Sequence, residues 1–153
     1  MIRSVPHDSE AFTQGLVMDN GRMFESTGLF GESTLREVNI TTGEIIRQTS
    51  LEPSLFGEGI AVVGDSIFML TWLNETALVF DKETFNLTST MSYEGEGWGL
   101  CFDGSNLVMS NGSSFLSFRN PANFEIIHSV EVTDSGGNGV QMINELECVS
   151  ADS

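Results

Sequence analysis

Short β-prone apolar runs separated by turn residues occur along the whole chain. The pattern is clearest in four runs, at residues 59–63, 67–72, 76–80 and 85–91. Runs of this length, bounded by Gly, Asn and Asp, predict strands joined by turns. No segment places apolar residues at a sustained helical period with caps, which argues against all-α and βαβ architectures. The sequence therefore predicts an all-β protein.

This four-strand pattern is repeated. Four short segments align at residues 13–16, 57–60, 97–100 and 143–146, and their spacings are 44, 40 and 46 residues. A second landmark follows each of the first three, at residues 38–43, 80–85 and 119–124. Four strands in a unit of about 40 residues are typical of a β-propeller blade. A sandwich would also have short strands, but not the same unit with the same two landmarks.

The repeats predict a single partial β-propeller domain. We expect blades at about residues 12–50, 56–92 and 96–133, and the first strand of a fourth blade from about 142 to 153. The opening strand of each blade would line a central channel, where glycine permits close approach of the backbone. Four residues of these opening strands should then converge at one end of the axis: Gln14, Glu58, Trp98 and Asn144.

The composition is strongly acidic, with 22 acidic and 6 basic residues, which give a net charge of −16. Such a surface repels phosphate backbones and anionic lipids, so we expect neither a nucleic-acid partner nor a membrane partner. The acids favour solubility, or they attract cationic groups such as the amino terminus of a peptide. No apolar run approaches the length of a membrane-spanning helix.

The two cysteines, Cys101 and Cys148, lie 47 residues apart without metal-ligand spacing. We expect both to be small buried apolar residues. The two histidines, His7 and His128, lie 121 residues apart and no carboxylate cluster accompanies them, so no metal site is expected. No secretory leader is visible at the start of the chain.

Seven motifs, in order, resemble glutaminyl-peptide cyclotransferases of the plant and bacterial type. They lie at residues 6–16, 25–28, 56–60, 70–72, 96–100, 109–113 and 144–147, and include Phe56-Gly57-Glu58-Gly59-Ile60 and Glu96-Gly97-Trp98-Gly99-Leu100. The resemblance implies a five-bladed propeller with its active centre at one mouth of the channel. It also implies a secreted or extracytoplasmic enzyme that needs no metal or other cofactor and acts on peptides or proteins with an N-terminal glutamine.

The resemblance also implies which residues form the site. These are Glu58 and Asn144 as catalytic residues, and Phe12, Gln14, Phe56, Trp72 and Trp98 as substrate-binding residues. We expect Glu25 and Glu145 to contact these residues, on the side away from the substrate, and to hold them in position. The family uses a further tryptophan and a lysine, and this chain ends before both.

Glu58 is the residue that we expect to move protons. Cyclisation requires the α-amine to attack the γ-carboxamide of its own glutamine and to expel ammonia, so one group must accept a proton and return it. The neighbours of Glu58 are Phe56, Gly57, Gly59 and Ile60, and such an environment raises a carboxyl pKa toward neutrality. The alternative is a carboxyl that ends a strand or pairs with an arginine.

For each of the other site residues, a purely structural role is the alternative to a role in binding or catalysis. The Asn144 amide suits an oxyanion or the γ-carboxamide, but it could instead make an Asx turn. The four aromatic residues would form a box around the substrate, although aromatic side chains often belong to the core. Gln14 would bind the substrate's amine or amide, or simply line the channel.

Two other functions remain open at this point. One is a propeller that only binds a peptide or a sugar, and the other is an inactive fragment. Because three blades cannot close a ring of five, we expect exposed blade edges that favour self-association, and little activity without the remaining blades.

Overall fold

The structure is a computed structural model that describes residues 4–149. Its twelve strands form three antiparallel sheets of four, and the described residues contain no helix. The first sheet contains β1 (Thr13–Asp19), β2 (Arg22–Thr27), β3 (Thr34–Val38) and β4 (Ile45–Ser50). The second contains β5 (Gly57–Val63), β6 (Ser66–Thr71), β7 (Thr76–Asp81) and β8 (Leu87–Ser92). The third contains β9 (Leu100–Phe102), β10 (Leu107–Met109), β11 (Phe115–Arg119) and β12 (Ile126–Glu131).

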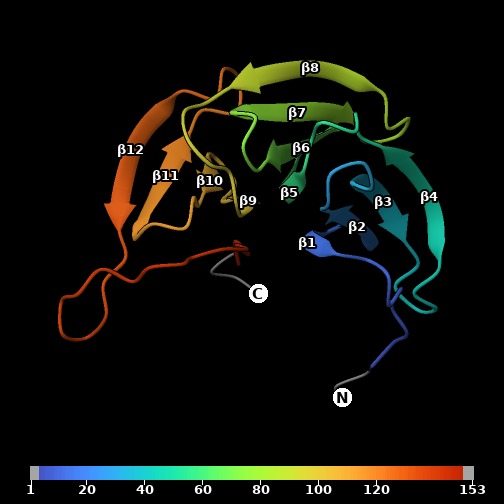
Figure 1. Cartoon of the computed structure of the whole chain (residues 1–153), viewed down its shortest axis with the longest axis horizontal. Helices are drawn as coiled ribbons and strands as arrows, with labels where there is room; N and C mark the ends of the chain where they lie inside the picture. The colour runs from blue at the N-terminus through green and yellow to red at the C-terminus, as the bar shows by residue number, and fades with distance from the viewer. Residues whose placement is uncertain (1–3, 150–153) are drawn as a thin grey trace.

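The three sheets stand side by side like the blades of a fan (Figure 1). Within each sheet, neighbours in sequence are neighbours in space, so each sheet is a simple meander. The opening strands β1, β5 and β9 lie at the inner ends, and β4, β8 and β12 form the outer rim. Strand β5 packs against β1 on one side and β9 on the other. The all-β, propeller-like architecture expected from the repeats is therefore confirmed.

Local turn chemistry sets the strand pairing at the tight hairpins. Asn20 and Gly21, which join β1 to β2, both have positive φ, at 48° and 78°. A two-residue hairpin turn whose twist matches that of the flanking strands requires positive φ at both of its residues. The pairing of Asp19 with Arg22 follows directly from this turn.

The second landmark of each repeat is a loop between the third and fourth strands, and this loop has the same conformation in all three sheets. Each loop begins at Asn39, Asp81 or Asn120. The carbonyl oxygen of this first residue accepts a hydrogen bond from the backbone amide of the fifth residue of the loop, at 2.7–2.8 Å. The side-chain oxygen of the first residue accepts a bond from the amide two positions on. The fifth residue has positive φ in all three loops and is Gly43, Phe85 or Phe124.

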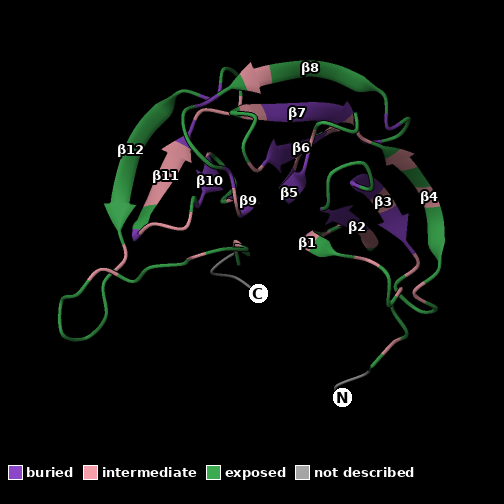
Figure 2. Ribbon diagram, in the orientation of Figure 1, coloured by how far each residue is buried: buried purple, intermediate pink, exposed green. Residues whose placement is uncertain are grey.

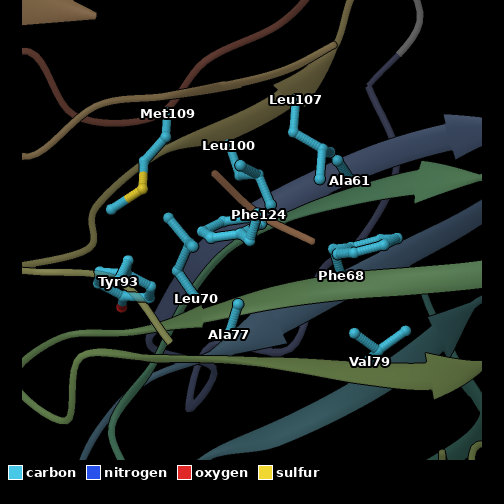
Figure 3. Close-up of a cluster of buried hydrophobic side chains, with 10 residues drawn as sticks. All are labelled: Ala61, Phe68, Leu70, Ala77, Val79, Tyr93, Leu100, Leu107, Met109 and Phe124. Atoms are coloured by element: carbon cyan, nitrogen blue, oxygen red, sulfur yellow. The ribbon is translucent and has the colours of Figure 1, made fainter. Parts of the chain in front are cut away.

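The core lies between the sheets. One cluster joins the first two sheets and includes Phe24, Leu35, Ile67 and Met69. The other joins the second and third sheets, and Figure 3 shows its ten side chains packed around Phe124. The outer strands β4, β8 and β12 are mostly exposed, whereas β5, β6, β7, β9 and β10 are mostly buried (Figure 2). Strand β1, at the open side of the first sheet, is mostly exposed or half-buried. Strand β5 therefore lies between the two clusters, with Ile60 in one and Ala61 in the other, which fixes the positions of the residues it carries.

Two expectations from the sequence are wrong. Cys101 and Cys148 form a disulfide, with their Cα atoms 5.5 Å apart, so neither is simply a buried apolar residue. Residues 142–149 form no strand, and the last four residues of the expected fourth opening strand lie outside the described part of the chain. A strand needs a neighbouring backbone to pair with along its length. Residues 142–149 instead cross the inner end of the third sheet, where the disulfide attaches them to β9.

Candidate active site

The opening strands are irregular where they carry the candidate residues. The pairing of β1 with β2 shifts register between Thr13 and Gly15, at Gln14. The pairing of β5 with β6 shifts between Gly57 and Ile60, at Glu58. A bulge bends a strand and changes the direction of a side chain, which is why bulges are frequent beside functional sites.

Glycines let successive opening segments lie against one another. A Cβ on Gly15 would lie 2.7 Å from the Ile60 nitrogen, and one on Gly59 would lie 2.7 Å from the Trp98 carbonyl oxygen. The amide of Gly59 donates to that same oxygen at 2.7 Å. The glycines thus place Gln14, Glu58 and Trp98 on adjoining backbones, because any larger residue would push these backbones apart.

A close backbone contact at a glycine also brings Asn144 to the site. A Cβ on Gly99 would lie 2.0 Å from the Asn144 carbonyl oxygen, so the two backbones touch. The Ser110 hydroxyl donates to that oxygen at 2.6 Å, and the Ser26 hydroxyl donates to the Glu58 carbonyl oxygen at the same distance. A hollow lined by Gln14, Asn144 and Glu145 brings the first and last opening segments together.

Glu58 is a buried carboxyl with unusual surroundings. The residue is only 5% exposed, and no described residue forms a hydrogen bond or ion pair with its carboxyl group. Burial raises its pKa to about 8, and the negative charges of Glu145 and Glu96 contribute further. A carboxyl with a pKa near 8 both accepts and donates protons at neutral pH.

Glu145 is a second carboxyl with a raised pKa. Its carboxyl accepts a hydrogen bond from the Leu16 amide at 3.2 Å, although the residue as a whole is exposed. Partial burial raises its pKa to about 7, the Leu16 and Leu146 amides oppose this rise, and Glu147 adds to it. Glu145 thus connects the chain after β12 to β1 and keeps negative charge near Glu58.

Four aromatic side chains form a cluster centred on Phe56. The Phe56 ring contacts those of Phe12, Phe30 and Trp72, with centroids 6.1, 5.4 and 5.5 Å away. Phe56 is buried, whereas Phe12 and Phe30 are half exposed. Gly28 makes room for Phe56, because a Cβ there would lie 2.3 Å from the ring. Phe30 was not among the residues expected from the sequence.

Glu96 is a second residue of the site, besides Phe30, that sequence reasoning missed. Its Oε2 atom accepts hydrogen bonds from the indole nitrogens of Trp72, at 2.7 Å, and Trp98, at 2.9 Å. These bonds lower the pKa of Glu96, so it stays ionised. Its position two residues before Trp98 in a matching motif was a signal, but the bond to Trp72 depends on the packing of two sheets.

The remaining expected residues lie around this centre. Glu25 is 1% exposed and binds the His7 ring at 2.8 Å and the Thr13 hydroxyl at 2.6 Å, so it anchors the segment that carries Phe12 and Gln14. No described residue hydrogen-bonds to the side-chain amide of Gln14 or Asn144. Both amides are therefore available to a ligand.

No cluster of three or more His, Cys, Asp or Glu side chains between residues 4 and 149 is placed to hold a metal ion. In the same part of the chain, nothing forms a helix of the length and hydrophobicity needed to cross a membrane.

Comparison with known proteins shows the family of the chain. The family described as glutamine cyclotransferase matches residues 1–152. The chain belongs to this family. It is 33% identical over 152 residues to a glutaminyl-peptide cyclotransferase of Arabidopsis thaliana. It is 37% identical to the crystal structure of Myxococcus xanthus glutaminyl cyclase, with a TM-score of 0.88 over 97% of this chain.

The chain spans about half the length of its plant relative, 47%, and 62% of the Myxococcus chain. A more distant match, the WD40 domain of Neurospora crassa Pan2, is 10% identical over 78% of this chain and 36% of that one, with a TM-score of 0.63. At that identity the likeness concerns the fold alone, and it agrees with propeller-like sheets.

Proposed function

We propose that the protein is a glutaminyl-peptide cyclotransferase that converts N-terminal glutamine to pyroglutamate, with Glu58 as its proton carrier. The observation that carries the proposal is the buried Glu58 carboxyl, whose pKa is raised to about 8 and which has no bonding partner among the described residues. A buried group without a structural partner fits a catalytic role better than a structural one.

The reaction needs no oxidant and no second substrate. The neutral α-amine attacks the carbonyl carbon of its own γ-carboxamide, a C–N bond forms, and the bond to the carboxamide nitrogen breaks. Glu58 takes the proton that the amine loses and returns it to the leaving nitrogen, which departs as ammonia. The α-ammonium group of a peptide has an ordinary pKa of about 7.7–8.0, so a useful fraction of the substrate amine is neutral and able to attack at neutral pH.

The other residues hold the substrate. Asn144 donates its amide hydrogen to the oxygen that becomes negative during attack, and Gln14 binds the amine. Phe12, Phe56, Trp72 and Trp98 restrict the glutamine side chain to the folded rotamer that brings amine and carboxamide together. Glu96 fixes the two indoles in place.

The test is ammonia release from a dipeptide that begins with glutamine, using the full-length protein. Glu58→Gln keeps the shape of the side chain but cannot carry the proton, so turnover should fall by roughly 10²-fold or more. Glu52→Gln is the matched control, since Glu52 is exposed in the loop between β4 and β5.

An N-acetylated dipeptide, which lacks the nucleophile, should release no ammonia. Undiminished turnover by Glu58→Gln would exclude Glu58 as the proton carrier. Binding of the dipeptide without any ammonia release would instead favour a propeller that only binds.

We further propose that the three sheets are blades of a five-bladed propeller, at about residues 12–50, 56–92 and 96–133, with residues 142–153 leading into the next. Three blades are about 60% of a five-bladed ring, close to the 62% of the Myxococcus cyclase that this chain covers. An apolar hollow on the third sheet, lined by Phe102, Val108, Leu116 and Phe118, offers a face for a fourth blade. Without that cover, this face favours self-association.

We also propose that the protein works outside the cytoplasm. The supporting observation is the Cys101–Cys148 disulfide, because disulfides persist in oxidising compartments and are rare in the cytosol. Fractionation of the source cells, with a thiol assay on the native protein, tests this proposal. A cytosolic protein with two free thiols would contradict it.

A further inference from the structure

Arg119 is a buried cation that has no carboxylate within 4 Å among residues 4–149. It is 6% exposed, whereas Arg22, Arg36, Arg47 and Lys82 each lie within 4 Å of an acidic side chain. The chain has 22 acidic residues, so an arginine left without one is unexpected. Leaving a buried charge unpaired destabilises a fold unless something else compensates.

The repeats make the position of Arg119 more unusual. In the three sheets, Val38, Phe80 and Arg119 each pair with the first residue after the same loop, at Ile45, Leu87 and Ile126. The first two sheets thus place an apolar side chain where the third places a guanidinium. Charge at this position is a property of the third sheet and is not required by the blade fold.

The guanidinium is only partly satisfied by the protein. Its Nε atom donates to the Ser117 hydroxyl at 3.1 Å, and Nη1 donates to the Phe124 carbonyl oxygen at 3.0 Å. Its carbon lies 4.9 Å from the centre of the Phe124 ring and 5.7 Å from that of Tyr93. No described residue accepts a hydrogen bond from Nη2. Burial lowers the pKa of Arg119, with only the Tyr93 hydroxyl opposing this shift.

Arg119 lines a cavity of about 480 Å³ between the second and third sheets. Three of the core side chains in Figure 3, Tyr93, Met109 and Phe124, form part of its wall. Phe115 and Ile126 add apolar surface, and the polar part of the lining includes hydroxyl, amide and carboxyl groups. The equivalent hollow between the first two sheets is smaller, about 260 Å³, and is lined by Leu51, Leu55 and Phe80 among others.

We propose that this cavity binds a small monocarboxylate with an apolar body, and that Arg119 binds the carboxylate. A guanidinium presents parallel N–H donors that match a carboxylate, and the hydroxyls around it suit the same oxygens. Phe115, Met109 and Ile126 take the apolar body. Glu94 and Glu125 also line the cavity, and the protein carries a net charge of −16, which disfavours a phosphate dianion relative to a singly charged ligand.

The proposal is tested with benzoate as the probe, at constant ionic strength, by NMR titration of backbone amides. Benzoate should shift the amides of residues 115–119 and 124–129, whereas neutral benzamide and inorganic phosphate should shift them at least ten times more weakly. Arg119→Gln should weaken benzoate binding at least tenfold, and Arg119→Lys should weaken it less.

Arg47→Gln is the matched control, because Arg47 lies over Phe85, the counterpart of Phe124, but already pairs with Glu37. It should bind benzoate like the unmodified protein. Ser129→Trp fills the cavity from β12 without altering Arg119 and should also abolish binding, which keeps the test valid if Arg119→Gln does not fold. Absence of shifts at these amides, equal binding of benzamide, or unchanged binding by Ser129→Trp would overturn the proposal.

Discussion

Glu37 and Glu58 are both almost completely buried, at 8% and 5% exposure, yet their surroundings are opposite. Near the outer rim, Arg22 and Arg47 bind the Glu37 carboxyl, at 2.8 and 2.7 Å. The hydrogen bonds of Arg22 are the main cause that lowers the pKa of Glu37 to about 2. At the inner ends of the sheets, Glu58 has no such partner and its pKa is raised to about 8.

This difference in surroundings means that one buried carboxyl stays charged and the other can change its protonation state. An ion pair on each side keeps Glu37 charged at every physiological pH, so it cannot exchange protons. It holds Arg22 and Arg47, which in turn reach Glu83 and Lys82 beside the second sheet. Burial without a cation, and with Glu96 and Glu145 nearby, leaves Glu58 able to gain or lose a proton at neutral pH. The ion pairs near the outer rim therefore stabilise the fold, whereas the buried Glu58 carboxyl at the inner ends lowers its stability when it ionises.

The largest expected effect on stability concerns the pH dependence that Glu58 imposes. Its pKa is about 8 in the folded state and about 4.5 when unfolded, so its stabilising contribution is complete below 4.5 and is lost as the pH rises through 8. Glu58→Gln should match the unmodified protein at pH 4 and exceed it by ~3 kcal/mol at pH 9. Urea unfolding at both pH values measures this, and equal gains at the two would contradict the comparison.

Glu37→Gln should act in the opposite direction. Arg22 and Arg47 would lose their shared carboxylate, and because both are partly exposed we expect a loss of ~2 kcal/mol in the free energy of unfolding at pH 7. The contribution of Glu37 is present above pH 4.5 and is lost as the pH falls through 2, so the two proteins should converge there. Cyclase turnover should stay within about twofold; a large drop would mean that the two regions are not separate.

The smallest effect is expected at Glu96. Glu96→Gln removes a negative charge near Glu58, so the pKa of Glu58 should fall by less than about one unit and the pH profile of turnover should shift down with it. Glu96→Ala also frees both indoles, which should raise KM about fivefold for the loss of roughly 1 kcal/mol of hydrogen bonding. A raised KM with an unshifted pH profile in both variants would leave Glu96 a purely mechanical role.

Sequence reasoning predicted the parts that depend on local pattern. The strands of the second sheet follow from short apolar runs, and the loops at Asn39, Asp81 and Asn120 follow from turn residues at fixed spacing. The raised pKa of Glu58 also follows from the sequence, because glycine and apolar neighbours supply no cation.

The missed features depend on contacts between distant segments. The Cys101–Cys148 disulfide forms because the chain after β12 returns to β9, which spacing alone does not reveal. Glu96 joins tryptophans from two different sheets. The unusual position of Arg119 was visible in the aligned repeats, but the lack of a partner for it was not.

The central claim is that Glu58 carries a proton at neutral pH, and the most direct test is its own titration. In the protein labelled with ¹³C at the glutamate side-chain carboxyl, with Glu58→Gln and Glu37→Gln used to assign the signals, the chemical shift of Glu58 should change with a midpoint near pH 8, while that of Glu37 should change near pH 2. A Glu58 carboxyl that titrates near its ordinary value of 4.5 would contradict the account.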